Sequence, residues 1–144
     1  MNIHNLQTSI RVNQRALTLF AKRAARATRQ APDDFSVVLV NDRTIQALNR
    51  RFLGRNRATD VLSFATGNSL APWNAMERHE ILRRGEIVIS VSTAQRQARR
   101  EGHSLFKELE MLIIHGMLHL MGYDHEVDHG QMTRKELALR DKLL

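Results

Sequence analysis

The residues best suited to chemistry in this chain are three histidines in one short segment, His115, His119 and His125. His115 and His119 are four positions apart, so on a helix their imidazoles lie on one face and point at the same region of space. Gly122 follows them, and glycine commonly ends helices because it adopts the left-handed conformation without steric cost. A chain reversal there brings His125 back toward the pair, so the spacing predicts a three-histidine metal site.

This ligand set favours one catalytic zinc ion per chain. Three neutral imidazoles suit Zn²⁺ at about 2.0–2.1 Å, and three protein ligands leave a fourth position for water or substrate. Copper, nickel and iron also accept imidazole ligands. A closed structural site completed by Asp124, Asp128 or His129 is the alternative arrangement. No functional role is expected for His4, His79 and His103.

The histidine spacing also matches the metzincin proteases, whose pattern is H-E-x-x-H-x-x-G-x-x-H. In those enzymes the glutamate beside the first histidine is the general base. Here that position is Gly116, which neither accepts nor donates a proton through a side chain. Peptide hydrolysis by the usual route is therefore not expected.

Length and composition indicate one domain, spanning residues 1–144, with a hydrophobic core. The chain has 144 residues, 42% of them hydrophobic, and no apolar run long enough to cross a bilayer. The first residues lack the charged start and apolar run of a signal peptide, and there is no cysteine. These features predict a cytoplasmic protein without disulfides or a membrane partner, and they leave its oligomeric state open.

The charge balance indicates an anionic partner. The formal net charge is +7 and the isoelectric point is about 11.0. Nucleic acid is the simplest such partner, because Lys and Arg neutralise phosphates and release counterions. Arginine supplies most of the positive charge, and its planar fork binds phosphate oxygens in pairs. A GC-rich genome would also favour arginine over lysine, so the charge supports RNA or DNA binding more strongly than the arginine content does.

Hydrophobic periodicity and capping residues predict alternating helices and strands. Three apolar, β-branched runs predict strands at 35–40, 60–64 and 86–90. Helices are expected at 13–30 and at 131–144. A second helix is expected from a cap at Asp42 to Phe52, and a third from a cap at Ser92 or Thr93 to Arg100. A fourth is expected to begin at Ser104 and to carry His115 and His119. Between the second and third strands, a polar segment with Gly67, Pro72 and Trp73 predicts a long loop or edge hairpin.

Two predictions concern how the histidines are supported. The helix that carries His115 and His119 is apolar around most of its circumference, which predicts a buried central helix. In the last helix Met132, Leu137 and Leu139 are expected to face inward. Metal-bound imidazoles commonly donate their second N–H to a carboxylate. The carboxylates nearest in sequence, and therefore expected in that role, are Asp124, Glu126 and Asp128.

Several motifs together show that the chain resembles the YbeY family of bacterial rRNA maturation factors, which are single-strand-specific metallo-endoribonucleases. The main one is H-G-x-L-H-L-x-G-Y-D-H at 115–125. The others are Leu48-Asn49, T-D-V-L-S-F at 59–64, G-E-I-V-I-S at 85–90, Ala94-Gln95 with Gln97-Ala98, and Met132 with Glu136. The resemblance implies an α/β fold with a mixed sheet of about four strands and about five helices. It also implies zinc on the three histidines, 16S rRNA 3′-end maturation and ribosome quality control.

The chain departs from the family pattern at two positions. Family members usually have an arginine before the glycine that ends the second helix, and a proline before the T-D-V-L-S-F strand. Here these positions are Leu53 and Ala58. The family arginine is expected to face the metal cleft. Arg51, Arg55 and Arg57 are therefore candidates to contact phosphate from shifted positions, with ordinary solvated charges as the alternative.

Three other functions compete with zinc-dependent RNA cleavage. One is an RNA-binding ribosome-assembly factor whose metal is structural. Another is a metalloprotease, which Gly116 disfavours. A third is a hydrolase of a small phosphorylated molecule, for which the basic charge would be incidental. The sequence assigns no general acid or base, and it does not decide whether water or the RNA's own 2′-hydroxyl attacks phosphorus.

Overall fold

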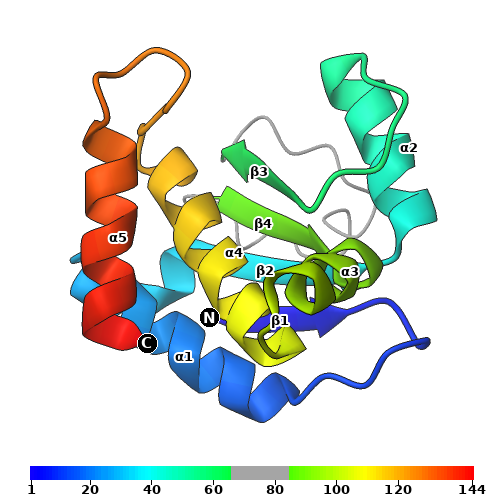
Figure 1. Ribbon diagram of the computed structural model, residues 1–144, viewed down its shortest axis with the longest axis horizontal. Helices are drawn as coiled ribbons and strands as arrows, with labels where there is room; N and C mark the ends of the chain where they lie inside the picture. Colours follow the sequence, from blue (N-terminus) through cyan, green and yellow to red (C-terminus); the bar gives the residue numbers. More distant parts are fainter. Residues whose placement is uncertain (66–84) are drawn as a thin grey trace.

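The computed structural model describes residues 1–65 and 85–144, which form a four-stranded sheet with helices on both faces (Figure 1). This confirms the mixed α/β fold expected from the sequence. The elements in chain order are β1 (Asn2–Asn5), α1 (Gln14–Ala27), the 3₁₀ turn η1 (Pro32–Asp34), β2 (Phe35–Val40), α2 (Asp42–Leu53), β3 (Val61–Ala65), β4 (Gly85–Ser90), α3 (Val91–Glu101), α4 (Leu105–Leu120) and α5 (Gln131–Leu143).

The strand order is β1-β2-β4-β3, with β1, β2 and β4 parallel and β3 antiparallel to β4. Every residue of β2 and β4 is buried, as expected for strands covered on both faces. Because side chains alternate along a strand, the sheet supplies two separate cores. Val37 and Leu39 join the core beneath α1 and α4, whereas Val38 and Val40 join the core beneath α2.

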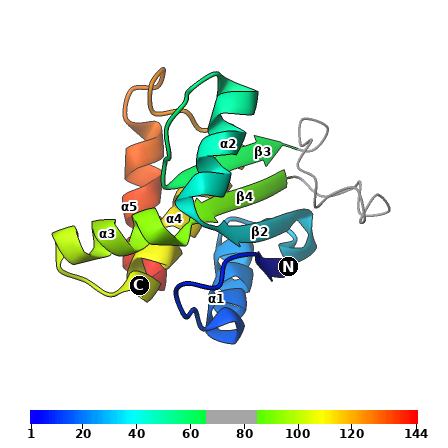
Figure 2. The same cartoon turned by 90° about the vertical axis from the view of Figure 1, so that its right-hand side faces the viewer.

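The two faces therefore carry different helices. α4 crosses β3 and β4 on one face, with α1 and α5 packed beside it, while α2 covers the opposite face (Figures 1 and 2). The prediction that α4 is a buried central helix is confirmed, since Leu109, Ile113 and Leu118 are at most 1% exposed. Each such side chain stabilises the fold by about 1.5–3 kcal/mol relative to an exposed position.

Capping explains most helix boundaries and corrects two predictions. Ser104 caps α4 as predicted, accepting from the backbone N–H of Lys107 at 3.1 Å. The cap of α2 is Asn41, so the prediction of Asp42 is one residue off. The cap of α3 is Ser90, so the prediction of Ser92 or Thr93 is wrong. In both cases the preceding strand runs directly into the helix, and the cap lies at the junction.

Three further differences separate the prediction from the structure. β1 was not predicted from the sequence, because its four residues gain order from pairing with β2 rather than from apolar alternation. Leu137 is 52% exposed, so the prediction that it faces inward is wrong, while Met132 and Leu139 are buried as expected. The predicted loop or hairpin with Gly67, Pro72 and Trp73 lies outside the described residues. Among the described helices, none is long and apolar enough to cross a membrane.

Candidate metal centre

α4 brings His115 and His119 together near its C-terminal end. One helical turn separates them, and their rings meet edge to face with centroids 4.7 Å apart. The Nε2 atoms of the two rings are 3.1 Å apart, so these nitrogens point toward each other. The prediction that the four-residue spacing places both imidazoles on one face is confirmed. The burial of α4 against the sheet keeps the backbone of both residues fixed.

A chain reversal after α4 delivers the third histidine, as expected. α4 ends at Leu120, and Gly122 adopts a left-handed conformation with φ of 96°. The N–H of Tyr123 then donates to the carbonyl of Leu118 at 3.0 Å, which closes the turn. His125 lies on the returning segment, with its ring centroid 5.8 Å from that of His115 and 5.7 Å from that of His119.

The arrangement fits a metal ion. The three histidines each offer one nitrogen, and these nitrogens all lie within 4.8 Å of one another. Two nitrogens bound tetrahedrally to one zinc at 2.0–2.1 Å would be about 3.3 Å apart, close to the 3.1 Å between His115 Nε2 and His119 Nε2. No carboxylate of residues 1–65 and 85–144 belongs to the group. The described geometry thus gives no support to a closed site completed by Asp124, Asp128 or His129.

Electrostatics keep His119 in the form that binds metals. Burial lowers the pKa of His119, and charge on His115 and His125 lowers it further. Both effects favour the neutral imidazole, because they disfavour an added positive charge. Asp124 opposes them, but the balance remains a lowered pKa. A neutral imidazole with a free nitrogen lone pair is the state in which histidine ligates a metal.

The carboxylate that reaches the histidine group is Glu136, on α5. Its Oε1 lies 2.9 Å from Nδ1 of His115, and its side chain is 14% exposed. Burial raises the pKa of Glu136, but the hydrogen bond and charge of His115, together with the charge of Arg140, outweigh burial and leave the pKa lowered. Glu136 is thus an ionised acceptor beside a candidate ligand. Glu136 is 21 residues from His115 in the chain, so the spacing of residues in the sequence does not predict this contact.

The carboxylates that were expected in this role have other hydrogen bonds. Asp128 accepts from the backbone N–H groups of Gly130 and Met132, and so holds the start of α5. These bonds lower the pKa of Asp128. Asp124 accepts from the N–H of Glu126 at 3.0 Å within the returning segment, and Glu126 is exposed. Their observed hydrogen bonds shape the segment that carries His125.

The same fold and sequence pattern occur in known proteins. The family model described as Endoribonuclease YbeY matches residues 2–143. The chain belongs to the YbeY family. A protein named Endoribonuclease YbeY from Desulforamulus reducens is 39% identical over 98% of this chain and 95% of its own length. Another with that name, from Pelotomaculum thermopropionicum, is 41% identical over 98% of this chain and 95% of its own length.

A solved structure shares the fold of this chain. The solution structure of TM1509 from Thermotoga maritima superposes with a TM-score of 0.62. The two chains are 25% identical, and the match covers 99% of this chain and 89% of the other. The fold of this YbeY-family chain therefore recurs in a distantly related bacterial protein.

The candidate phosphate-contacting arginines lie apart from α4. Arg51 is on the last turn of α2, and Arg55 and Arg57 are on the connection to β3. All three side chains are exposed, and α2 packs on the face of the sheet opposite α4 (Figure 2). The backbone of the connection is held, since Asn49 Nδ2 donates to the carbonyl of Arg57 at 3.0 Å. Leu53, at the position of the YbeY-family arginine, is 56% exposed.

At Gly116, α4 packs closely against the sheet. A Cβ at this position would be 2.7 Å from Cγ2 of Ile87 on β4, well inside van der Waals contact. The carbonyl of Gly116 accepts from Ser63 Oγ on β3 at 3.3 Å. The residue beside His115 therefore faces the sheet, and no side chain fits there. This packing removes the position that the metzincin proteases use for their base.

The structure shows the surroundings of two of the three histidines for which no functional role was expected, His4 and His103. His103 Nε2 lies 3.2 Å from Oε2 of Glu108 at the start of α4 and so has a hydrogen-bond partner there. His4 lies on β1 and also has a partner. His79 falls outside the described residues. Neither described residue belongs to the three-histidine group.

Proposed function

We propose that this chain is a single-domain, zinc-dependent endoribonuclease that cleaves single-stranded RNA during ribosomal RNA maturation. The proposal extends to 16S rRNA 3′-end processing, ribosome quality control and a cytoplasmic location with the ribosome as partner. The observation that carries it is the three-histidine group, whose candidate ligand atoms lie within 4.8 Å of one another in a YbeY-family chain. The formal net charge of +7 supports a phosphate-rich substrate.

In this proposal His115, His119 and His125 hold one Zn²⁺. The all-imidazole set suits zinc, and three ligands leave a position open for substrate or water. When bound, zinc polarises a phosphoryl oxygen as a Lewis acid and lowers the pKa of a coordinated water toward 7. His125 is exposed, so the group is accessible from solvent.

The remaining tasks fall to other side chains. Charge that develops on the phosphoryl oxygens is stabilised by a cation aimed at the reacting phosphate. Arg51, Arg55 and Arg57 are exposed, so their guanidinium groups are available to phosphate in solvent. We assign them to phosphate contact and leave the proton carrier unassigned.

The principal alternative is an RNA-binding ribosome-assembly factor with a structural metal. The observation that favours it is Leu53, an exposed apolar side chain where the family usually has an arginine. Such a protein would bind RNA with a steep salt dependence, because phosphate contacts release counterions, but no cleavage product would accumulate. A protease is disfavoured because the sheet closes the position of its base at Gly116.

A cleavage time course on single-stranded rRNA fragments separates these functions. It compares wild type, His119→Ala, and chelator-stripped wild type before and after zinc is added back. We expect cleavage by wild type, a fall of at least about 100-fold in the variant, and recovery of the stripped sample with zinc. Stoichiometric zinc and tight RNA binding, with product no higher than in His119→Ala, would favour the assembly factor.

A further inference from the structure

The contact between His115 and Glu136 joins two helices at the edge of the histidine group. The imidazole of His115 has two nitrogens, and each has a partner. Nε2 faces Nε2 of His119 at 3.1 Å, and Nδ1 faces Oε1 of Glu136 at 2.9 Å. An ionised carboxylate only accepts hydrogen bonds, so in neutral His115 the proton lies on Nδ1. The lone pair is then on Nε2, which points into the group.

Glu136 is itself held by its surroundings. Its side chain is mostly buried between α4 and α5, which limits its rotamers. Arg140 lies one helical turn further along α5, with Nη2 3.6 Å from Oε1 of Glu136. The same carboxylate oxygen, Oε1, therefore faces both the His115 ring and the Arg140 guanidinium.

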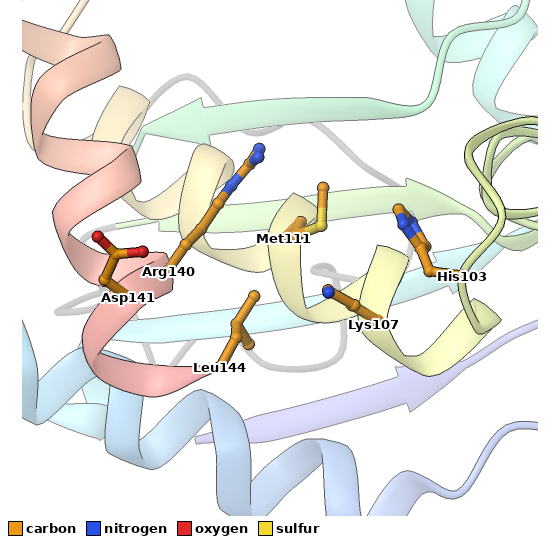
Figure 3. A pocket seen from close by; sticks show the side chains of 6 residues that line it. All are labelled: His103, Lys107, Met111, Arg140, Asp141 and Leu144. Atoms are coloured by element: carbon orange, nitrogen blue, oxygen red, sulfur yellow. The ribbon is translucent and has the colours of Figure 1, made fainter.

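Arg140 projects from α5 toward α4, beside Met111 (Figure 3). It lines a hollow of about 460 Å³ to which Lys107 also contributes. The Arg140 side chain is 33% exposed. Water screens such a partly exposed pair, so Arg140 supports Glu136 less strongly than Glu136 supports His115.

We propose that Glu136 is the positioning residue of the metal centre, fixing His115 as a ligand through Nε2, with Arg140 as its supporting cation. The inference rests on the proposed binding of zinc by the three histidines. It makes α5 part of the metal centre, although α5 supplies no ligand. The nearer carboxylates do not compete for this role, since Asp124 and Asp128 bond to backbone N–H groups and Glu126 is exposed.

Zinc affinity tests the inference without any activity assay. Competition with a chromophoric chelator is measured for Glu136→Gln, which keeps the size of the side chain but loses the charge. We expect zinc affinity to fall about 10- to 100-fold, the usual effect of removing a carboxylate partner from a ligating histidine. Arg140→Gln should lower affinity by about twofold to fivefold. Glu126→Gln, next to His125 but exposed, is the matched control and should bind like wild type.

Two comparisons separate positioning from a merely structural effect. Thermal unfolding of the zinc-free proteins shows whether Glu136→Gln still folds. Glu136→Asp should recover part of the lost affinity, because it restores the carboxylate at a shorter reach. Wild-type affinity in a folded Glu136→Gln protein would overturn the inference, and so would an equal loss in Glu126→Gln.

The tautomer of His115 gives a readout that does not require zinc to bind. In ¹⁵N NMR spectra of zinc-free protein with the imidazoles neutral, His115 of wild type should show protonated Nδ1 and unprotonated Nε2. Glu136→Gln should show a mixture of tautomers, since an amide both donates and accepts. A wild-type protein that binds no zinc but has the expected tautomer would contradict the proposed function alone. A wild-type His115 protonated at Nε2 would overturn the positioning role.

Discussion

The three histidines and the arginine segment, defined by Arg51, Arg55 and Arg57, differ in how firmly the fold holds them. His115 and His119 stand on a buried helix, and Glu136 fixes one ring from a second helix. The three arginine side chains are exposed, on the last turn of α2 and the connection that follows it, and α2 packs on the other face of the sheet. The fold therefore holds the candidate metal ligands in place before substrate binds, whereas the arginine side chains extend into solvent, with Arg51 against the ring of Phe52.

Zinc binding should have the largest effect, because the histidine group is already assembled. A ligand at 1,000 times its Kd stabilises the folded state by about 4 kcal/mol. Wild type titrated with zinc should therefore show a marked rise in unfolding temperature by calorimetry. The rise should disappear in His119→Ala, which removes one of the three nitrogens. An equal rise in both proteins would mean that zinc binds elsewhere.

Gly116→Ala tests how tightly the histidine helix is fixed to the sheet. The added methyl group would lie 2.7 Å from Ile87 Cγ2, so α4 or Ile87 must shift. We expect the free energy of unfolding to fall by about 2 kcal/mol, as is usual for an overpacked core. Urea denaturation measures the loss. Combined with Ile87→Ala, which removes the contacting atoms, the substitution should cost less than it does alone.

Leu53→Arg tests whether the arginine region limits activity. Leu53 is 56% exposed, so the longer side chain fits without disturbing the core. A guanidinium at the family position should raise kcat/KM on single-stranded RNA about tenfold, which corresponds to about 1.4 kcal/mol of transition-state stabilisation. Leu137→Arg adds the same charge at a leucine that is 52% exposed on α5. An equal gain in kcat/KM for both variants would mean that the added positive charge, and not its position at residue 53, is responsible.

Asp42 tests how α2, the helix that leads to the arginines, is tied to the rest of the fold. Burial raises the pKa of Asp42, but hydrogen bonds from Ser90, Thr93 and Arg96 outweigh it and lower the pKa. A lowered pKa stabilises the fold above the unfolded value of about 3.9, and the stabilisation disappears as the pH falls through the folded value.

Asp42→Asn should therefore cost about 1 kcal/mol at pH 7, a figure reduced for the partial exposure of the carboxylate. The difference from wild type should shrink as the pH falls below about 4. Chemical denaturation at several pH values between 7 and below about 4 measures this difference in the free energy of unfolding. Asp141→Asn, at an exposed aspartate, is the control. A difference that stayed constant down to low pH would show that the carboxylate charge is not responsible.

The triple variant of Arg51, Arg55 and Arg57 to Gln should have the smallest effect per residue. Each phosphate contact to a single strand contributes about 0.7 to the slope of log affinity against log salt. Fluorescence anisotropy with single-stranded RNA should show a shallower slope at unchanged zinc content. The matched control replaces three other exposed arginines, Arg43, Arg99 and Arg100. An equal decrease of the salt slope in both triple variants would indicate that RNA is attracted by the overall positive charge and not by contacts at these three positions.

The sequence predicted local features well because their causes are local. The helix start at Ser104 and the reversal at Gly122 follow from capping and backbone conformation, and both are confirmed. Errors occurred where a neighbouring element decides the outcome. β1 forms only because β2 provides an edge, and Leu137 is exposed because other residues of α5 face the core.

The histidine group was determined by the sequence itself, since helical spacing and one glycine bring the three rings together within 11 residues. Only the tertiary structure decided what surrounds the group. The packing of α5 on α4 places Glu136 against His115, and the packing of α4 on β4 closes the space beside Gly116. The physical reason is that spacing along one helix fixes directions within it, whereas contacts between elements depend on how their buried faces pack.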